Sequence, residues 1–137
     1  MTTSIIDPSV HVASFPSTYT GPGTLIGNTI QSGGDETDVH GYFTSNGNTV
    51  QINLGFQPMR VHIVNITDGI QWDWMYGFPA TDTIKTTDAT PAFATDTTSQ
   101  IVATDQSGST NIDGNWILTL GTTLCGTSKV ICFHVEG

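Results

Sequence analysis

Short runs in which apolar and polar residues alternate dominate the chain from Asp38 onward. In Thr49–Leu54 every second residue is apolar. Successive side chains of a β-strand point to opposite faces, so this alternation predicts a strand with one buried and one solvated face. Glycine-containing pairs such as Asn46-Gly47, Asp68-Gly69 and Asp113-Gly114 separate the runs, as turns do in antiparallel hairpins.

The same pattern predicts about eight short strands and no helix of normal length. Met59–Thr67 carries apolar residues on both faces, which predicts a central strand covered on both sides. Ala80–Ser99 has few apolar residues, so we expect one short strand and a loop there. Nine runs are candidates for these strands, namely Asp38–Thr44, Thr49–Leu54, Met59–Thr67, Ile70–Tyr76, Thr83–Thr86, Gln100–Thr104, Thr110–Ile112, Trp116–Leu120 and Lys129–Glu136. Their spacing indicates an all-β fold, an antiparallel β-sandwich or a small barrel.

Residues 1–34 do not alternate. They contain Pro8, Pro16 and Pro22 together with several glycines, which predicts an irregular N-terminal arm followed by a single β-sandwich domain at 35–137. The arm also holds too many apolar residues for a solvated tail. We therefore expect it to pack on its own body or on a neighbouring subunit.

The charge of the chain disfavours two classes of partner. Twelve acidic and three basic residues among 137 give a formal net charge of -9, and Arg60, Lys85 and Lys129 are far apart in the sequence. Nucleic acids and anionic membranes bind clustered cations, so neither is predicted as a partner. The excess negative charge is also adequate to keep a threonine-rich β protein in solution. No apolar run is long enough to span a membrane and no signal peptide is recognisable, so we expect no export.

An aromatic stripe in Ile70–Tyr76 is the sharpest binding candidate. Trp72, Trp74 and Tyr76 share one face of a predicted strand with Ile70. Flat aromatic side chains on an exposed face stack against sugar rings. The same spacing is equally typical of a buried sheet face, so the sequence leaves both interpretations open.

The sequence patterns that could indicate a metal site or a disulfide are weaker than the aromatic stripe. Cys125 and Cys132 are too widely spaced for a zinc knuckle, and whether they form a disulfide is left open. The four histidines show no ligand spacing, although His134 shares a strand face with Cys132. The acidic cluster Asp35, Glu36 and Asp38 is better explained as a solvated loop than as a calcium site. We predict no metal and no cofactor.

Catalytic motifs are also missing from the sequence. It contains no G-x-S-x-G, P-loop or G-x-G-x-x-G pattern, and a hydrolase using two of the twelve acids stays a remote alternative. The triplet Asn65-Ile66-Thr67 matches a glycosylation sequon, which we interpret as a strand end and turn. We therefore predict that the protein is not an enzyme.

The order of features after Thr49 resembles that of a family of viral proteins. Gly55-Phe56-Gln57-Pro58 leads into the segment Arg60–Asp68, and Gln71-Trp72-Asp73-Trp74 and Ile84-Lys85-Thr86 follow. In this it is similar to small virion proteins of tailed bacteriophages, particularly capsid decoration, or cement, proteins. The arm at residues 1–34 departs from the resemblance.

The resemblance implies a structural protein on the capsid surface of the virion, assembled in the host cytoplasm. The expected partners are the major capsid protein and further copies of the chain in a homotrimer, which would bridge capsomers and stabilise the shell. The arm is the expected shell contact, through Ile5, Ile6, Val10, Val12 and Phe15. The alternative function is a carbohydrate-binding module or tail-tip adhesin that uses Trp72, Trp74 and Tyr76.

Overall fold

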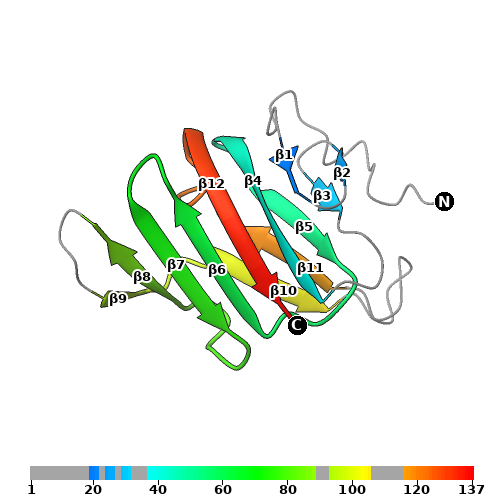
Figure 1. Cartoon of the computed structure of the whole chain (residues 1–137). Helices are drawn as coiled ribbons and strands as arrows, with labels where there is room; N and C mark the ends of the chain where they lie inside the picture. Colours follow the sequence, from blue (N-terminus) through cyan, green and yellow to red (C-terminus); the bar gives the residue numbers. More distant parts are fainter. Residues whose placement is uncertain (1–18, 22–23, 27–28, 32–36, 89–92, 106–115) are drawn as a thin grey trace.

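The fold is a β-sandwich. The computed structural model describes residues 19–21, 24–26, 29–31, 37–88, 93–105 and 116–137, which are coloured in Figure 1. Within these ranges twelve strands form two stacked sheets, with neither a helix nor a closed barrel. The predicted all-β sandwich is therefore confirmed, whereas the predicted strand Thr110–Ile112 lies outside the described residues.

The larger sheet has seven strands in the order β1-β4-β12-β6-β7-β8-β9, and all neighbours are antiparallel. The last strand in the sequence thus lies near the middle of this sheet, between β4 and β6 (Figure 1). The strands are β1 (Tyr19–Thr20), β4 (Asp38–Asn46), β6 (Arg60–Asn65), β7 (Ile70–Met75), β8 (Thr83–Thr87), β9 (Phe93–Asp96) and β12 (Thr127–Glu136). Strand β9 was not predicted, because its four residues show no alternation of apolar and polar side chains.

The smaller sheet has five strands in the order β10-β11-β5-β3-β2. Its one departure from the predicted antiparallel arrangement is the parallel pair β3–β5, in which Ile30 lies opposite Ile52. The strands are β2 (Thr24–Ile26), β3 (Thr29–Gln31), β5 (Val50–Leu54), β10 (Ile101–Asp105) and β11 (Trp116–Leu120).

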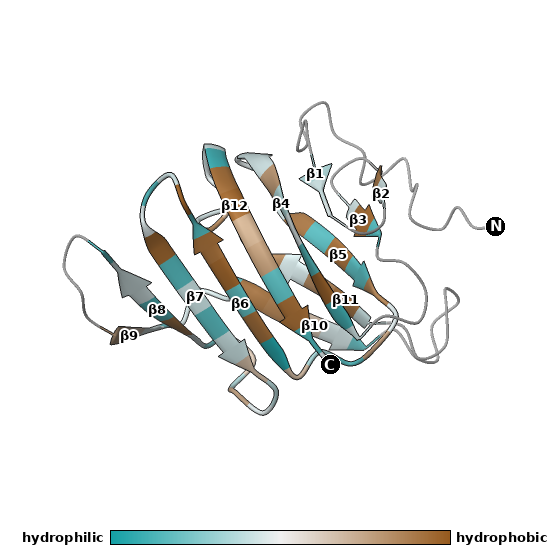
Figure 2. Ribbon diagram, in the orientation of Figure 1, coloured by the Kyte–Doolittle hydropathy of each residue, from teal (hydrophilic) through white to brown (hydrophobic). Residues whose placement is uncertain are grey.

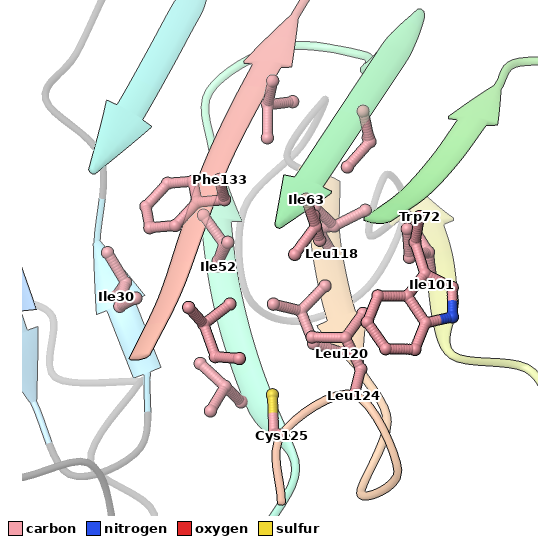
Figure 3. Close-up of a cluster of buried hydrophobic side chains, with 14 of the residues drawn as sticks. Ile30, Ile52, Ile63, Trp72, Ile101, Leu118, Leu120, Leu124, Cys125 and Phe133 are labelled. Atoms are coloured by element: carbon pink, nitrogen blue, oxygen red, sulfur yellow. The ribbon is translucent and has the colours of Figure 1, made fainter. Parts of the chain in front are cut away.

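Alternating side chains from both sheets fill the space between them. Along β6 the ribbon changes between brown and teal (Figure 2). Burial also alternates along β6 and β7, so each strand turns one set of side chains toward the core. Trp72 has the largest fully buried side chain, and it packs in the cluster drawn in Figure 3. The other fully buried members are Ile30, Val39, Phe43, Val50, Ile52, Leu54, Val61, Ile63, Ile101, Leu118, Leu120, Leu124, Cys125, Ile131 and Val135.

Three short strands lie before residue 34, within the segment predicted as an irregular arm. Residues 19–31 contain β1, β2 and β3, which pair with the body of the sandwich, and Ile30 is completely buried. Tyr19 stacks on Phe133 with 5.9 Å between the ring centroids, over Gly41, where a Cβ would lie 2.4 Å from the Thr20 carbonyl oxygen. These strands escape sequence detection because two or three residues are too few to show a period.

Strand β6 is central, as predicted, but its two faces are not equally covered. Val61 and Ile63 are fully buried between the sheets, whereas Val64 on the opposite face is only half-buried. Ile66, just beyond the strand, is 58% exposed. The second face of this apolar strand therefore remains accessible in the described part of the chain.

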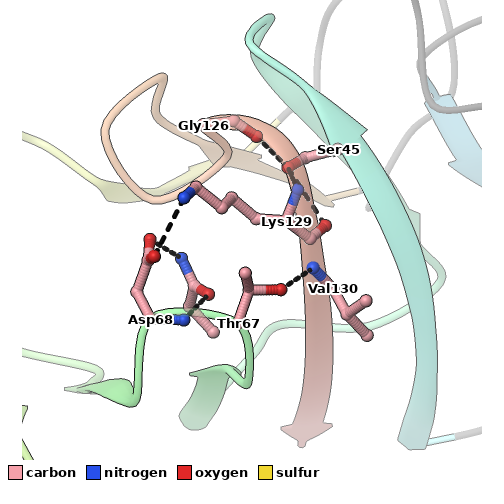
Figure 4. Close-up of polar contacts among 7 residues, drawn as sticks. Ser45, Thr67, Asp68, Gly126, Lys129 and Val130 are labelled. Atoms are coloured by element: carbon pink, nitrogen blue, oxygen red, sulfur yellow. Dashed lines mark hydrogen bonds and ion pairs between the residues drawn. The ribbon is translucent and has the colours of Figure 1, made fainter.

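A buried hydroxyl holds the irregular start of β12 against β4. The pairing of these strands shifts between Thr127 and Val130, and Ser128 adopts a φ of 59°, as expected at a β-bulge. Ser45 is 2% exposed, donates a hydrogen bond to the Gly126 carbonyl and accepts one from the Lys129 backbone N–H at 3.3 Å (Figure 4). One side chain thus satisfies two backbone groups that the bulge leaves unpaired.

Replacing Ser45 with alanine is expected to destabilise the fold by about 1–3 kcal/mol, because a buried donor and acceptor lose their partner. Chemical denaturation followed by tryptophan fluorescence measures this loss. The control is Asp68→Asn, which removes the ion pair of Asp68 with Lys129 (2.9 Å) nearby. That pair is at the surface, so the control should change stability less. The hydrogen bond from Lys129 also lowers the pKa of Asp68. The stability that the Asp68–Lys129 pair adds is therefore lost as the pH falls through this lowered pKa. Equal losses in both variants would contradict the role assigned to Ser45.

Candidate functional site

The face of the seven-stranded sheet that points away from the smaller sheet is the candidate site, and we call it the outer face. Its side chains alternate with the buried ones on each strand, and antiparallel register aligns them across the sheet. It comprises His40 and Tyr42 of β4, Cys132 and His134 of β12, Arg60, His62 and Val64 of β6, Gln71, Asp73 and Met75 of β7, Ile84 and Thr86 of β8, and Phe93 and Thr95 of β9.

Exposed apolar side chains gather on this sheet. The large apolar residues with substantial exposure in the described ranges are Tyr42, Met59, Ile66, Met75, Tyr76, Ile84 and Phe93. All of them belong to the seven-stranded sheet or to turns next to its strands, and no strand residue of the smaller sheet with a described side chain is among them. Phe93 is the extreme case, with 84% of its surface accessible. Exposed apolar side chains that lie together, as Met75, Ile84 and Phe93 do, are typical of sites that bind other molecules.

Three of these side chains surround one hollow. Met75, Ile84 and Phe93 come from three adjacent strands and line a cavity of about 500 Å³, together with Phe78 from the turn after β7. Its size falls within the range of ordinary ligand sites, roughly 300–1,000 Å³. Sequence reasoning missed this site because the residues come together only through the register of β7, β8 and β9.

A row of histidines crosses the same face. His40, His134 and His62 lie opposite one another on β4, β12 and β6, and Asp73 continues the row on β7. His62 Nδ1 is 2.7 Å from Asp73 Oδ1, and His134 Nε2 is 2.6 Å from Asp38 Oδ1. The spacing along the chain gives no sign of this row, because it depends on strands distant in sequence. These two contacts, His62 with Asp73 and His134 with Asp38, each join side chains from neighbouring or nearby strands of the larger sheet.

The aromatic stripe does not form an exposed platform. Trp72 is fully buried and Trp74 is 6% exposed, whereas Tyr76 is 53% exposed. For the two tryptophans the core interpretation of the stripe is confirmed. A ring must be accessible to stack on a sugar, so of the three predicted platform residues only Tyr76 is available.

Trp72 is held by polar contacts at one end of its ring. Its Nε1 lies 3.5 Å from Asp96 Oδ2, and Lys85 Nζ lies 5.6 Å from its ring centroid. Burial opposes the ionisation of Asp96, but hydrogen bonds from Thr98 and Trp72 and the charge of Lys85 outweigh it and lower its pKa. These contacts lock β7, β8 and β9 together beneath the hollow.

Tyr76 lies at a second hollow, at the rim between the two sheets. Its ring meets that of Trp116 edge to face, with 6.5 Å between centroids. Trp74, Phe78 and Val102 complete a cavity of about 350 Å³ together with small residues. Its described side chains are aromatic and aliphatic, and Tyr76 and Trp116 add a hydroxyl and an indole N–H. The adhesin alternative would use Tyr76 as its one accessible platform residue, because Trp72 and Trp74 are buried.

The remaining predicted candidates have structural roles or lie outside the described ranges. Cys125 and Cys132 are both free thiols, and burial raises the pKa of Cys125 to about 12, which suits an inert core residue. Asn65 is fully buried and bonded to Asp68, as predicted for a strand end and turn. The acidic cluster is described only at Asp38. The arm residues Ile5, Ile6, Val10, Val12 and Phe15 also lie outside the described residues.

Neither a metal cluster, nor a membrane-spanning helix, nor a match to a known protein points to a function of the described ranges. In the described ranges no three or more His, Cys, Asp or Glu side chains are grouped to hold a metal ion. No helix with the length and apolar character of a membrane span occurs there either. Comparisons with protein-family models, curated proteins and solved structures give no match.

Proposed function

We propose that the protein is a virion structural protein of a tailed bacteriophage, which binds the outer surface of the capsid and stabilises the shell by bridging capsomers. The observation that carries the proposal is the gathering of exposed apolar side chains on the seven-stranded sheet, with none among the strand residues of the other sheet whose side chains are described. The resemblance of residues 49–137 to decoration proteins supports the same function.

The proposed mechanism uses the rigidity and the copy number of the protein rather than a reaction. A β-sandwich changes little on binding, so it fixes the distance between the shell subunits that it contacts. Joining several copies in a homotrimer turns weak contacts into strong attachment, because after the first contact the others form at high local concentration. The shell would then resist the outward pressure of packaged DNA.

The proposed shell contact combines the outer face with the segment before β1. Residues 1–18 precede Tyr19, whose strand β1 pairs with β4 at the edge of the seven-stranded sheet. The described structure therefore begins at the β1 edge of the seven-stranded sheet. In this proposal the apolar residues of the arm reach a neighbouring shell subunit while the outer face rests on another.

A sedimentation experiment tests the outer face. Purified protein is mixed with empty tailed-phage shells assembled without it, and the fraction that sediments with the shells is measured. The double variant Tyr42→Ser with Phe93→Ser is expected to lose at least tenfold in affinity, because two exposed aromatic anchors disappear. The matched control is Tyr76→Ser, which removes a ring of similar exposure at the rim between the sheets. Unchanged binding of the double variant, or no binding of the wild type, would contradict the proposal.

Light scattering coupled to size-exclusion chromatography tests the oligomer. A mass three times that of the chain is expected for the homotrimer, and closed three-fold symmetry would match three-fold positions of a shell. A monomer at all concentrations would contradict trimer formation before capsid binding.

A further inference from the structure

The hollow on the outer face contains a charged group that the rest of the protein does not use. Arg60, at the start of β6, lies directly opposite Met75 of β7 and lines the same cavity as Ile84 and Phe93. A guanidinium beside three apolar side chains is suited to a ligand that has both an apolar group and an anion.

Arg60 differs from the two other cations of the chain. Lys129 forms an ion pair with Asp68 at 2.9 Å, and Lys85 lies over the Trp72 ring. Among the described residues Arg60 forms no ion pair, although Glu136 lies opposite it on β12. Its donors are therefore available to a partner.

One acid lies in the wall of the hollow and opposes an anionic ligand. Asp73 lines the cavity two positions before Met75, and its Oδ1 contacts His62 Nδ1 at 2.7 Å. The net charge of -9 also repels anions at long range. Salt screens charges beyond about 10 Å at ordinary ionic strength, so inside the hollow the neighbouring guanidinium dominates over distant acids. Asp73 lowers the affinity of the hollow for an anion, because its carboxylate repels a negative charge nearby.

We propose that the hollow of Arg60, Met75, Ile84 and Phe93 binds a segment of the shell protein in which a carboxylate accompanies an aromatic or aliphatic side chain. The carboxylate pairs with the Arg60 guanidinium, and the apolar side chain packs among Met75, Ile84 and Phe93. This inference rests on the proposed function, because it gives the chemistry of the partner at the outer face. A planar guanidinium holds a carboxylate through two parallel hydrogen bonds, so it fixes orientation as well as affinity.

The test uses two small probes that differ only in charge, N-acetylphenylalanine and its uncharged amide. Each is titrated into isotope-labelled wild-type protein, and the NMR shifts of Met75, Ile84 and Phe93 report the site. The acid is expected to bind about tenfold more tightly than the amide, a difference of about 1.4 kcal/mol, because hydrogen bonds to a charged group are stronger than those to a neutral one. Equal affinities, no binding of the acid, or shifts confined to other parts of the protein would overturn the proposal.

Two variants with opposite expected effects sharpen the test. Arg60→Gln removes the charge and should abolish the preference for the acid, while Asp73→Asn removes the opposing charge and should strengthen binding of the acid. Both side chains are accessible on the outer face, so neither change is expected to unfold the protein. Unchanged discrimination in Arg60→Gln would overturn the proposal even if the wild type preferred the acid.

The outcome can be separated from that of the proposed function. The probe titration uses the isolated protein and needs no shell. If wild-type protein binds shells but shows no preference for the acid, only the hollow is contradicted. If it prefers the acid but never sediments with shells, the function is contradicted, and with it the shell protein as the source of the segment.

Discussion

Replacing Trp72 with alanine is expected to lower the free energy of unfolding by about 3–5 kcal/mol, the usual loss when a large buried aromatic side chain is removed. Trp72 is fully buried and also contacts Asp96 and Lys85. Small domains are stable by only about 5–15 kcal/mol, so this single change removes a large part of the total. Denaturation by urea, with the slope of the transition checked against wild type, measures it.

Tyr76 provides the control for Trp72. The two residues lie on the same predicted strand face, but Tyr76 is 53% exposed and touches Trp116 only with its edge. Tyr76→Ala should therefore cost about 1 kcal/mol, the value of an aromatic pair at the surface. Similar losses in the two variants would mean that the stripe is uniformly exposed or uniformly buried, contrary to the structure.

Removing residues 1–33 is expected to destabilise the sandwich by several kcal/mol, because the deletion takes away β1, β2 and β3. Loss of the fully buried Ile30 side chain alone has an expected cost of about 2–5 kcal/mol. The deletion also uncovers the edge of β5, which then presents unpaired backbone groups to other chains. We expect broadened thermal unfolding and concentration-dependent association, measured by circular dichroism and light scattering.

A shorter deletion separates folding from attachment. Removing residues 1–18 leaves β1, β2 and β3 in place, so the unfolding transition should stay close to that of the full chain. Under the proposed function this variant should no longer bind the shell, because it lacks Ile5, Ile6, Val10, Val12 and Phe15. If the variant without residues 1–33 unfolds like the full chain, β3 contributes little to the stability of the core.

Local alternation allows the strands of the body to be predicted, but not how they meet. Val50–Leu54 and Trp116–Leu120 match their predicted positions within a residue, because core-facing apolar residues such as Ile52 and Leu118 recur at every second position. The predicted solvated face of Val50–Leu54 is wrong, since Asn53 is only 5% exposed. The short strand β3 contributes only three residues, which is too few for a period to appear. Its place in the sandwich is set by the contact of Ile30 with the core, which is a tertiary effect.

The sequence does not show which residues of the candidate site lie next to one another. His40, His62 and His134 form one row only because β12 lies between β4 and β6. Arg60 meets Met75 through the register of β6 and β7. The sequence identified the aromatic residues of β7 but left open whether they face the core or solvent. Register decides such questions, since a shift of one residue exchanges the two faces of a strand.

The position of β12 has a consequence for synthesis of the protein. Because β12 is inserted between β4 and β6, the larger sheet cannot close while residues 127–136 are still inside the ribosome. Until then β4 and β6 each present an open strand edge that can pair with a nascent neighbour. Closure of this sheet therefore waits for the segment from Thr127 onward, and products that end before Thr127 are left with two edges prone to aggregation.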